Sequence, residues 1–516
     1  MPSRRIAAAT AALAAAALVS PLLLAGPAGA TGSPQSDAAR GDALARKLVK
    51  DATGKGAFNH LKVFQSIADY NNGTRVAGSK GHEQSAKYVE AVMRAAGYKV
   101  TKNEFDFVYV ETIAEKLTVN GSNAHDVPIH LMTYTASSPE GGVTAQVAVA
   151  PVDADGTNGC EPGDFAAGAF TGKIALVKRG GCTFAVKQAN AAAAGAVGAV
   201  IYNNTTGALS GTLGDANAGK VPTGGISQAD GEKLAADAAA GPVEVTLDIR
   251  EFRENRTTYN VVAETRGGDE SNTVFLGAHL DSVAAGPGIN DNGSGSAGIL
   301  QVAQRLASSQ TKIKNKVRFA WWSAEEYGLL GSEAYVAGLT DAQKKQIKLY
   351  LNFDMIASPN SAYFVYDGDN SDGVGAGPGP EGSAQLEKGI TDFLDSKKIP
   401  HAGTDFSGRS DYGPFIEAGI PSGGTFTGAE GIKTPEEAAK FGGRAGVAYD
   451  VNYHAEGDDI TNIDQKALDI NVDVIADAVG HYAFDLAPLS KPVVSVPTPG
   501  GGSGGGLHEG HDEVRQ

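Results

Sequence analysis

Three almost uninterrupted apolar runs constrain the fold of this chain more than any other feature of its sequence. The runs read TVFLGAHL, VRFAWWSA and LYLNFDM, and they begin at Thr273, Val317 and Leu349. Stretches with helical periodicity lie between them, such as AGILQVAQRLA from Ala297. Apolar strands that alternate with helices are typical of a sheet covered on both faces. The sequence therefore predicts an α/β fold whose mixed, largely parallel sheet carries helices on both faces.

Each of the three predicted strands ends in side chains that can bind a metal or move a proton. His279 and Asp281 close the first strand, Glu325 and Glu326 follow the second, and Asp354 follows the third. Ligands of open α/β sheets bind beyond the carboxyl ends of the strands. We therefore expect these side chains to meet at one edge of the sheet.

Asp291, in a glycine-rich turn, and His454, near the end of the folded region, extend this set of donors. Such a set suits two zinc ions, because zinc binds imidazole nitrogen and carboxylate oxygen, and a catalytic zinc keeps a position for water. We expect His279 and Asp354 to hold one ion. Glu326 and His454 would hold the other, with Asp291 bridging the two.

Glu325 precedes a predicted ligand without needing to bind metal itself. It is the natural general base, which takes a proton from water and passes it to a leaving amine. Two adjacent acids at a strand end are, taken alone, more often solvated loop charges. The ordered set of an imidazole and several carboxylates at successive strand ends argues for a site instead.

Two glycine-rich motifs carry no function. Residues 293–298 match the dinucleotide fingerprint G-x-G-x-x-G, but the strand ends too early and no acidic residue follows before Glu325. Residues 501–505 match the serine-hydrolase pattern G-x-S-x-G, but they lie in a glycine linker without the required strand and helix. We reject both interpretations.

The two ends of the chain are predicted to be an export signal and a linker. Residues 1–30 combine Arg4 and Arg5, an Ala/Leu-rich run and the small residues 28–30, as signal peptides do. A membrane anchor is the alternative, and twin-arginine export is an alternative to ordinary secretion. Residues 488–516 are rich in Pro, Gly and Ser. We expect a secreted protein with no stable membrane anchoring.

Composition excludes several classes of protein. The 59 acidic residues outnumber the 43 Lys and Arg, so the formal charge of −16 argues against a nucleic-acid partner. Two cysteines exclude a disulfide-dense scaffold and a cysteine-rich zinc module. We expect a monomer.

Several motifs together resemble the secreted bacterial double-zinc aminopeptidases, the family that includes aminopeptidase Y and aminopeptidase S. They are GAHLDS, INDNGSGSAG, FAWWSAEEYGLLGS, LNFDMIASPN, GRSDYGPF and YHAEGDD, and the match extends over most of residues 41–486. The resemblance implies a zinc-exopeptidase fold. It also implies removal of large apolar residues such as leucine from peptides or proteins with free N-termini.

The resemblance implies the same ligands and the same role for Glu325. Asp281 would orient His279, and Tyr453 would donate a hydrogen bond to the developing oxyanion. Arg409 would lie near the substrate, although an exposed loop arginine is the alternative. A carboxypeptidase or other amide hydrolase on the same scaffold, and a metal-free receptor-like binding protein, remain alternative functions.

Two features concern the periphery of this site. Some relatives carry cysteines where this chain has Asn452 and Gly457, so we expect packing to fix the intervening loop. Asp51, Asp469 and Asp473 resemble a Ca²⁺ site of some relatives, but surface carboxylates on a helix are commoner without metal.

Residues 163–204 resemble a protease-associated domain, a small β-rich module. Cys160 and Cys182 fall close to or within this stretch, and in an exported protein we expect them to form a disulfide. The module would shape substrate access or dock polypeptide, and a purely structural role is the alternative.

These inferences predict five segments along the chain. They are a signal peptide (1–30), the N-terminal part of the peptidase domain (31–129), an inserted protease-associated domain (130–245), the zinc peptidase catalytic domain (246–487), and a linker with a disordered tail (488–516).

Overall fold

The computed structural model describes residues 36–152, 156–373, 375 and 377–493. The predicted signal peptide and the predicted tail from residue 494 onward lie outside these described residues. Within the described ranges, no helix combines the length and the apolar character that crossing a membrane requires.

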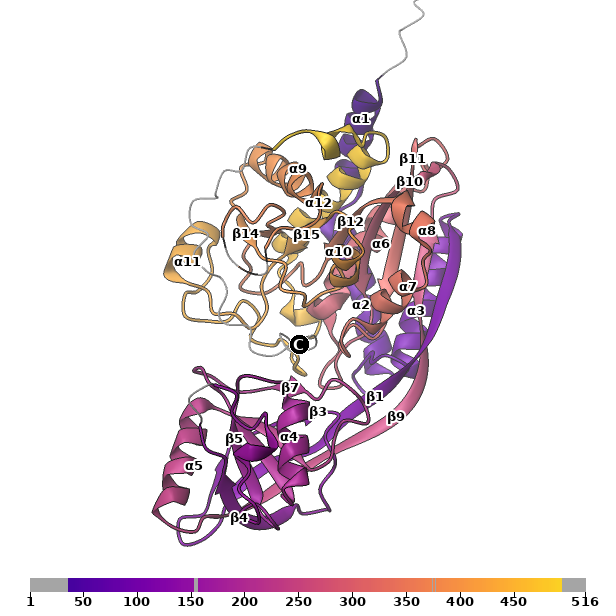
Figure 1. The fold of residues 1–516 in the computed structure, drawn as a ribbon. Coiled ribbons are helices and arrows are strands. Elements are labelled where there is room, and N and C mark those ends of the chain that lie inside the picture. The colour runs from indigo at the N-terminus through magenta and orange to yellow at the C-terminus, as the bar shows by residue number, and fades with distance from the viewer. Residues whose placement is uncertain (1–35, 153–155, 374, 376, 494–516) are drawn as a thin grey trace, which may run out of the picture. The chain divides into compact units, whose positions relative to one another are not determined.

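A main sheet organises the larger part of the molecule (Figure 1). β12, β10 and β11 are parallel neighbours, β15 continues in parallel from β12, and β9 is antiparallel to β11. The predicted mixed, largely parallel sheet is thereby confirmed. Its strands, from one edge to the other, are β14 (Ala402–Thr404), β13 (Phe364–Tyr366), β15 (Ser422–Phe426), β12 (Ile347–Phe353), β10 (Asp269–His279), β11 (Asn315–Trp322), β9 (Glu244–Glu264) and β1 (Lys99–Val119).

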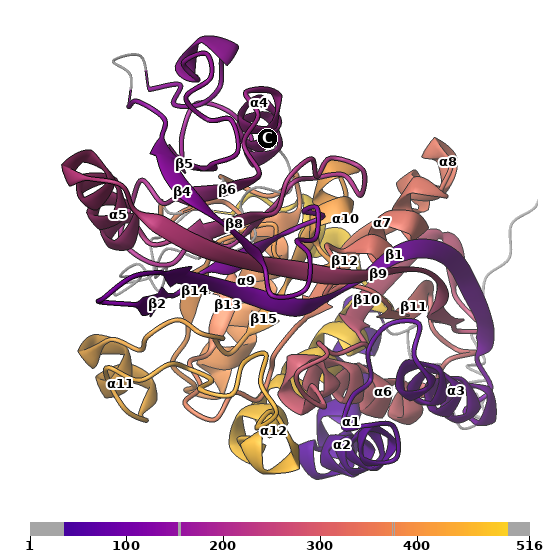
Figure 2. The same ribbon diagram turned by 90° about the horizontal axis from the view of Figure 1, so that it is seen from below.

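Helices cover both faces of the main sheet, as predicted. In Figure 2 the helices α1, α2, α3, α6 and α12 gather on one side of β10 and β11, and α7 lies on the other side. The helices of the first face are α1 (Asp37–Asp51), α2 (Gly54–Asp69), α3 (Lys80–Ala95), α6 (Gly295–Leu306), α9 (Ser383–Ser396) and α12 (Gln465–Tyr482). The others are α7 (Leu330–Ala337), α8 (Asp341–Gln346), α10 (Gly413–Glu417) and α11 (Pro435–Phe441).

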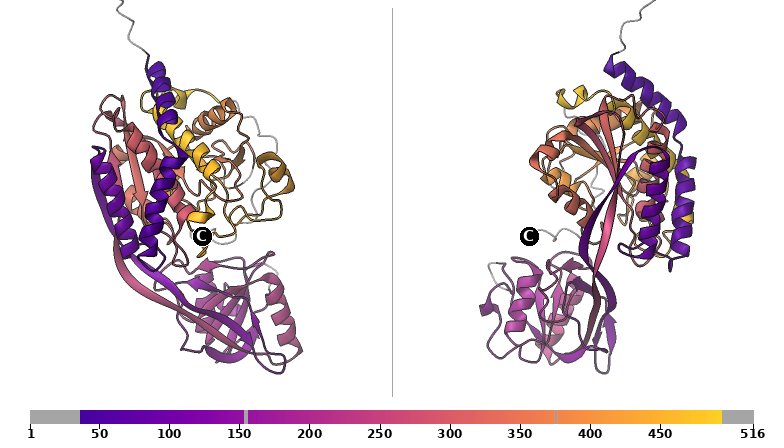
Figure 3. Two further views of the ribbon diagram at one scale, coloured as in Figure 1. Left: turned by 180° about the vertical axis from the view of Figure 1, so that it is seen from behind. Right: turned by 90° about the vertical axis from the view of Figure 1, so that its right-hand side faces the viewer.

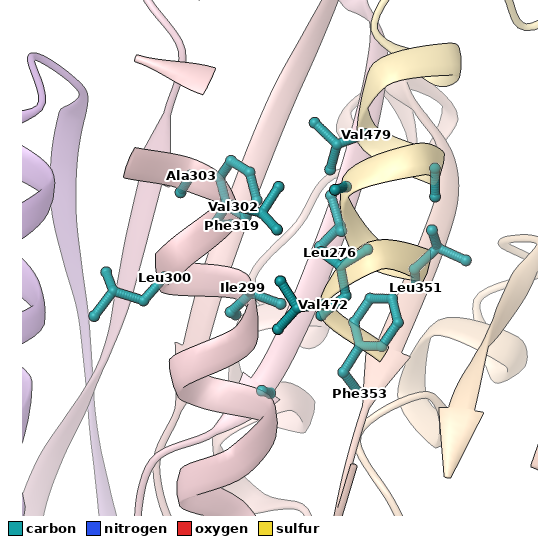
Figure 4. Close-up of a cluster of buried hydrophobic side chains, with 14 of the residues drawn as sticks. Leu276, Ile299, Leu300, Val302, Ala303, Phe319, Leu351, Phe353, Val472 and Val479 are labelled. Atoms are coloured by element: carbon teal, nitrogen blue, oxygen red, sulfur yellow. The ribbon is translucent and has the colours of Figure 1, made fainter. Parts of the chain in front are cut away.

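Burial on both faces explains why the predicted strands are apolar almost throughout. Successive side chains of a strand point to opposite faces of the sheet. Leu276, Phe319 and Leu351 pack with the side chains of α6 and α12 (Figure 4). Their neighbours Phe275 and Tyr350 pack on the opposite face against α10. Neither face of these central strands is free for polar residues.

A smaller module is inserted between β1 and β9, two strands of 21 residues each that pair along their whole length (Figure 3). β9 pairs with β11 of the main sheet at one end and with β4 of the module at the other. It therefore crosses the boundary predicted at residue 245. The other elements of the module are β2 (His125–Val127), β3 (His130–Thr133), β4 (Val143–Val149), β5 (Ile174–Lys178), α4 (Phe184–Ala193), β6 (Gly198–Tyr202), β7 (Gly211–Thr212), β8 (Thr223–Ile226) and α5 (Gln228–Ala240).

Cys160 and Cys182 form a disulfide within the module. Lys187 lies beside it on α4, fully buried, and donates hydrogen bonds to the carbonyl oxygens of Asn158 and Gly180. The disulfide and this lysine together tie the loops on either side of β5 to the helix.

Candidate metal centre

The ends of three parallel strands lie side by side at one edge of the main sheet. His279 is the last residue of β10 and lies opposite Trp322, the last residue of β11. Asp354 follows directly after β12, and Glu325 follows closely after β11. The ladder of the sheet therefore brings these side chains to one place, as their position at strand ends predicts.

The first group of donor atoms comes from His279, Asp291 and Asp354. The Nε2 atom of His279 lies 3.2 Å from Asp291 Oδ1 and 3.4 Å from Asp354 Oδ1. Asp354 Oδ2 accepts a hydrogen bond from Ser410, whereas Asp354 Oδ1 is buried and finds no hydrogen-bond partner among the described residues. An imidazole nitrogen and two carboxylates thus converge on a shared point.

The second group comes from Asp291, Glu326 and His454. The Nε2 atom of His454 lies 3.2 Å from Asp291 Oδ2 and 3.0 Å from Glu326 Oε2. Glu326 Oε1 is buried and, within the part of the chain that the structure describes, has no hydrogen-bond partner. Asp291 therefore presents one oxygen to each group.

The donor chemistry of both groups fits zinc. Each group offers one imidazole nitrogen and two carboxylates, which are zinc ligands, and three protein ligands leave a coordination position open. Buried carboxylate oxygens without a hydrogen-bond donor are costly unless a cation satisfies them. All five residues predicted as ligands lie together, three in each group, with Asp291 in both.

The electrostatics of the cluster favour a bound cation. Burial raises the pKa of Glu325 well above its usual value, and the neighbouring Asp354 carboxylate raises it further. Burial alone would lower the pKa of His279, yet the charges of Glu325 and Asp354 raise it well above the usual value. For Glu325 burial is the larger cause and repulsion between the neighbouring carboxylates the smaller one, whereas the His279 shift reflects attraction to the same carboxylates. Doubly charged cations at the two groups would relieve that repulsion.

Glu325 and Asp281 lie next to His279 without belonging to either donor group. Glu325 Oε2 is 3.7 Å from His279 Nε2, and the Glu325 side chain is 9% exposed. Asp281 Oδ1 lies 3.6 Å from His279 Nδ1 and accepts a hydrogen bond from the backbone N–H of Glu325. Asp281 thus contacts the back of the imidazole while Glu325 faces the same side as the ligands.

Tyr453 and Arg409 form a polar contact at the rim of the site. The Tyr453 hydroxyl oxygen accepts a hydrogen bond from Arg409 Nη2 at 3.1 Å. Arg409 Nη1 donates to Glu430 Oε1 at 2.9 Å, which fixes the guanidinium. The rings of Tyr453 and His454 stack with centroids 3.8 Å apart. The Arg409 side chain is therefore held by two hydrogen bonds and is 16% exposed, and its place near the substrate stays a prediction.

Three non-glycine residues with positive φ lie at or next to the donor groups. Ala324, Met355 and His454 adopt positive φ values of 59°, 48° and 55°. Non-glycine residues are uncommon in this left-handed region, and such strain costs on the order of 1–3 kcal/mol per residue. At Ala324 and Met355 the chain changes direction directly before Glu325 and directly after Asp354.

A cavity of about 230 Å³ opens onto the two donor groups. Its wall includes all the predicted ligands together with Glu325, Tyr453 and Arg409. The remaining lining combines apolar and aromatic side chains, namely Leu329, Met355, Tyr366, Tyr412, Phe426 and Ala429, with polar and acidic ones such as Glu333 and Asp405. The apolar and aromatic part of this wall offers a contact surface for an apolar side chain, beside polar and acidic groups.

The loop that carries Tyr453 and His454 is held by hydrogen bonds, where the sequence predicted packing. The Asn452 side chain donates to Asn462 Oδ1 at 2.7 Å, and its backbone N–H donates to Asp450 Oδ1 at 2.9 Å. The acceptors Asp450 and Asn462 are buried, with exposed fractions of 1% and 4%, whereas Asn452 itself is partly exposed.

Arg75 and Asp411 are among the buried charged residues near the site that sequence reasoning missed. Arg75 is fully buried and donates to the backbone carbonyls of Leu280, Pro287 and Gly288, in the segment between β10 and Asp291. The Asp411 carboxyl is fully buried as well, and burial raises its pKa to about 8. A signal existed for Asp411, which stands beside Arg409 in GRSDYGPF, whereas nothing in the sequence around Arg75 marks it.

The predicted calcium ligands are engaged within the protein. Asp469 Oδ1 accepts a hydrogen bond from the backbone N–H of Gly54 at 2.6 Å, and Asp51 pairs with Lys47 at 3.0 Å. These residues and Asp473 do not form one of the metal-competent groups found among the described residues. Calcium binding stays a prediction.

Family comparisons match both parts of the chain. The model for peptidase family M28 matches residues 260–479, and the model for the PA domain matches residues 143–234. The chain is 47% identical to leucine aminopeptidase 2 of Trichophyton rubrum, over 83% of either protein. It is 48% identical to leucine aminopeptidase 2 of Arthroderma otae, over 80% of either protein. Because these relatives are fungal, the predicted restriction to a bacterial type is not supported.

Solved structures show the same fold. An aminopeptidase from Aneurinibacillus sp. strain AM-1 superposes with a TM-score of 0.67 at 27% identity, covering 88% of this chain and 98% of that one. BSAP, described as a zinc aminopeptidase from Bacillus subtilis, gives 0.58 at 27% identity, covering 83% of this chain and 94% of that one. The predicted combination of the main sheet with an inserted protease-associated domain is confirmed.

Proposed function

The chain belongs to peptidase family M28 and is a metallo-aminopeptidase, and we propose that it uses two zinc ions to remove large apolar residues from free N-termini. The observation that carries this proposal is the pair of three-residue donor groups that share Asp291 at the wall of a cavity. The names of the relatives support leucine as a preferred residue.

His279, Asp291 and Asp354 would hold one zinc ion, and Asp291, Glu326 and His454 the other. When bound, the two ions polarise the scissile carbonyl and make a water molecule acidic near neutral pH. Asp281, placed behind Nδ1, would orient the His279 ring.

Glu325 would act as the general base. Its carboxylate faces the donor groups without belonging to either, and raised basicity suits a group that must accept a proton near neutral pH. It would take a proton from the attacking water and pass that proton to the nitrogen of the leaving peptide.

Tyr453 would stabilise the oxygen of the scissile carbonyl, on which negative charge develops. Because its hydroxyl oxygen already accepts from Arg409, its own proton is free to be donated toward the substrate. Arg409 would therefore act near the substrate by setting the direction of the Tyr453 hydroxyl.

The substrate's first residue would enter the cavity with its side chain against the apolar lining. Its charged α-amine needs acidic neighbours, and among the several carboxylates that line the cavity Glu325 and Asp354 would take this role. A blocked amine would lose that recognition, which is why the chain would act on free N-termini only.

Export from the cell is part of the proposal. The disulfide between Cys160 and Cys182 suits an oxidising compartment, and the predicted signal at residues 1–30 would direct the chain there. Peptides or proteins with free N-termini would be the substrates of a monomeric enzyme.

One set of assays tests the proposal. We expect the purified protein to hydrolyse leucine p-nitroanilide, to leave the N-acetylated compound intact, and to lose activity on treatment with 1,10-phenanthroline until zinc is restored. Undiminished cleavage next to an acetylated N-terminus would favour another amide hydrolase. Protein with less than about one zinc per chain and no hydrolysis would favour a receptor-like binding role. Adding Ca²⁺ to chelated protein tests the calcium prediction separately.

A further inference from the structure

The loop between Asp450 and Asn462 carries two residues of the proposed site, yet it contains no strand and only the short helix η3 (Ile460–Asn462). His454 lies within it at a positive φ, and its side chain is 33% exposed. A metal ligand must be held to within about 0.5 Å of its working position. The loop therefore needs support that a sheet supplies elsewhere.

Asp458 connects this loop to the backbone of the shared ligand Asp291. Asp458 Oδ2 accepts the backbone N–H of Asp291 at 2.9 Å, and Asp458 Oδ1 accepts that of Asn290 at 2.8 Å. The backbone carbonyl of Asp458 accepts a third bond, from the N–H of Ile289, at 3.0 Å. Asp458 is 2% exposed, so all these bonds are shielded from water.

Asn462 and Asp450 close the base of the loop. The Asn462 side-chain amide lies 3.0 and 2.9 Å from the two oxygens of Asp450 and 3.1 Å from Asp458 Oδ1. Asp450 Oδ2 also accepts from the Asn290 side chain at 2.7 Å. Asn452 joins the network through its bond to Asn462 Oδ1. Both segments that carry ligands, around Asp291 and around His454, are thus bound to one set of side chains.

We propose that Asp450, Asn452, Asp458 and Asn462, here called the loop clamp, are positioning residues that set the distance between His454 and Asp291. The inference rests on the proposed function, because it assigns the clamp to the second zinc ion and to Tyr453. A network that merely stabilised the fold would need only bonds within the loop. In this network both carboxylate oxygens of Asp458 accept hydrogen bonds from the backbone of the segment that carries Asp291.

The geometry of the loop offers a direct test, because a covalent link can replace the clamp. A Cβ atom built on Gly457 would lie 3.5 Å from Cβ of Asn452. Disulfides join cysteines whose Cβ atoms are about 3.5–4.5 Å apart. The two positions flank Tyr453 and His454, so Asn452→Cys with Gly457→Cys would close the loop at its base.

The experiment begins with Asn462→Leu, which keeps the branched shape of the side chain and removes the donor shared by Asp450 and Asp458. Removal of partners behind a metal ligand typically costs 10–100-fold in metal affinity or activity. We expect kcat to fall about 30-fold with little change in KM, and the weaker of two zinc affinities to fall at least 10-fold. Asn315→Leu is the matched control. Asn315 is buried like Asn462, with 2% against 4% of its surface exposed, but it is the first residue of β11 and therefore lies at the end of that strand away from the donor groups. We expect the control to lose stability without either change.

The decisive step adds Asn452→Cys and Gly457→Cys to Asn462→Leu. After oxidation with oxidised glutathione, with the new disulfide verified by mass spectrometry, we expect kcat and the second zinc affinity to recover at least 5-fold. Dithiothreitol should reverse that recovery, and wild-type protein treated in parallel should keep its activity. A folded Asn462→Leu protein with wild-type kcat and zinc affinity would overturn the proposal. So would a verified disulfide that restores neither.

The zinc titration separates the two proposals. If wild-type protein binds two zinc ions but hydrolyses no aminoacyl amide, the proposed function fails while the clamp is still tested by zinc affinity. If wild-type protein is active and Asn462→Leu changes neither kcat nor zinc binding, the clamp fails and the proposed function stands.

Discussion

His279 and His454 contact the same carboxylate, Asp291, but the protein holds them in different ways. His279 ends a central strand that pairs with both β11 and β12; His279 itself lies opposite Trp322 of β11, and its side chain is 1% exposed. His454 lies in a loop at a positive φ, and its side chain is 33% exposed. The strand position needs no special support, whereas the loop position depends on a buried network of side chains.

The comparison shows where each half of the site is vulnerable. Ladder bonds between backbone groups are insensitive to the identity of most side chains. A buried polar network is sensitive, because removal of one member leaves the others without partners at a cost of about 1–3 kcal/mol per group. Four predictions test this difference, beginning with the one that has the largest expected effect.

Removal of metal is expected to abolish activity in two steps. The ion at Glu326 and His454 should leave first, because His454 is more exposed and held by a loop. The measurement is zinc per chain and residual turnover at increasing chelator concentration. Simultaneous loss of both ions would mean that the two donor groups bind zinc with similar affinity.

Glu325→Gln tests the half of the site whose residues stand at strand ends, which includes His279 and Asp354. We expect turnover to fall roughly 1,000-fold, because general base catalysis contributes about 10²–10⁴-fold, while the zinc content stays unchanged. Steady-state kinetics and metal analysis measure the two quantities. Glu436→Gln, at an exposed position of α11, is the control and should behave as wild type. Substantial turnover by Glu325→Gln would remove this residue from its role.

Tyr453→Phe tests the half of the site that lies in a loop, which carries Tyr453 and His454. Loss of one donor to a developing oxyanion costs about 10²–10³-fold, and we expect a loss near the lower limit, about 100-fold, in kcat with KM little changed. The exposed Tyr70→Phe serves as the control. A loss larger than that of Glu325→Gln would mean that the loop, and not the strand end, carries the main chemistry.

The smallest expected effect concerns the stability of the fold and comes from His481, which lies away from the site. It also tests whether zinc binding is independent of the packing between α1 and α12. His481 on α12 lies 3.3 Å from Asp477 and 3.3 Å from Asp42 on α1. The hydrogen bond with Asp477 and the charge of Asp42 raise the pKa of His481, although burial and Arg46 oppose this.

Because that pKa is raised in the folded state, the stabilising contribution is complete below the ordinary pKa of about 6.5 and is lost as pH rises through the folded value. We expect a small decrease in the free energy of unfolding between about pH 6 and pH 8, measured by urea denaturation. His481→Gln should weaken this dependence. Zinc content should stay constant over the same range, and a parallel loss of zinc would link outer packing to the site.

Much of the site was predictable because its residues follow recognisable strands. His279, Glu325 and Asp354 each stand at or just beyond the end of an apolar run, and parallel strands place such residues together. His454 lies in a loop without such a run, so its role was inferred from its residue type and from family resemblance.

Other residues could not be predicted. Arg75 and Asp458 carry the same charges as solvated surface residues, and no local pattern distinguishes a buried charge from an exposed one. Arg75 is far from its partners in the sequence, and its hydrogen bonds go to backbone carbonyls, which every residue has. The role of Asp458 likewise depends on the backbone of Asn290 and Asp291.

The inserted module was inferred from its resemblance to a known domain. The sequence by itself determined the alternation of apolar strands and helices and the types of donor at their ends. These properties are local, because periodicity, residue type and spacing are written in neighbouring residues. Only the tertiary structure decided that Asp291 turns one oxygen to each histidine, that Arg409 donates a hydrogen bond to Tyr453, and that buried hydrogen bonds join the loop of His454 to the segment of Asp291. Such distances join residues far apart in the chain, and they follow from the packing of the whole molecule.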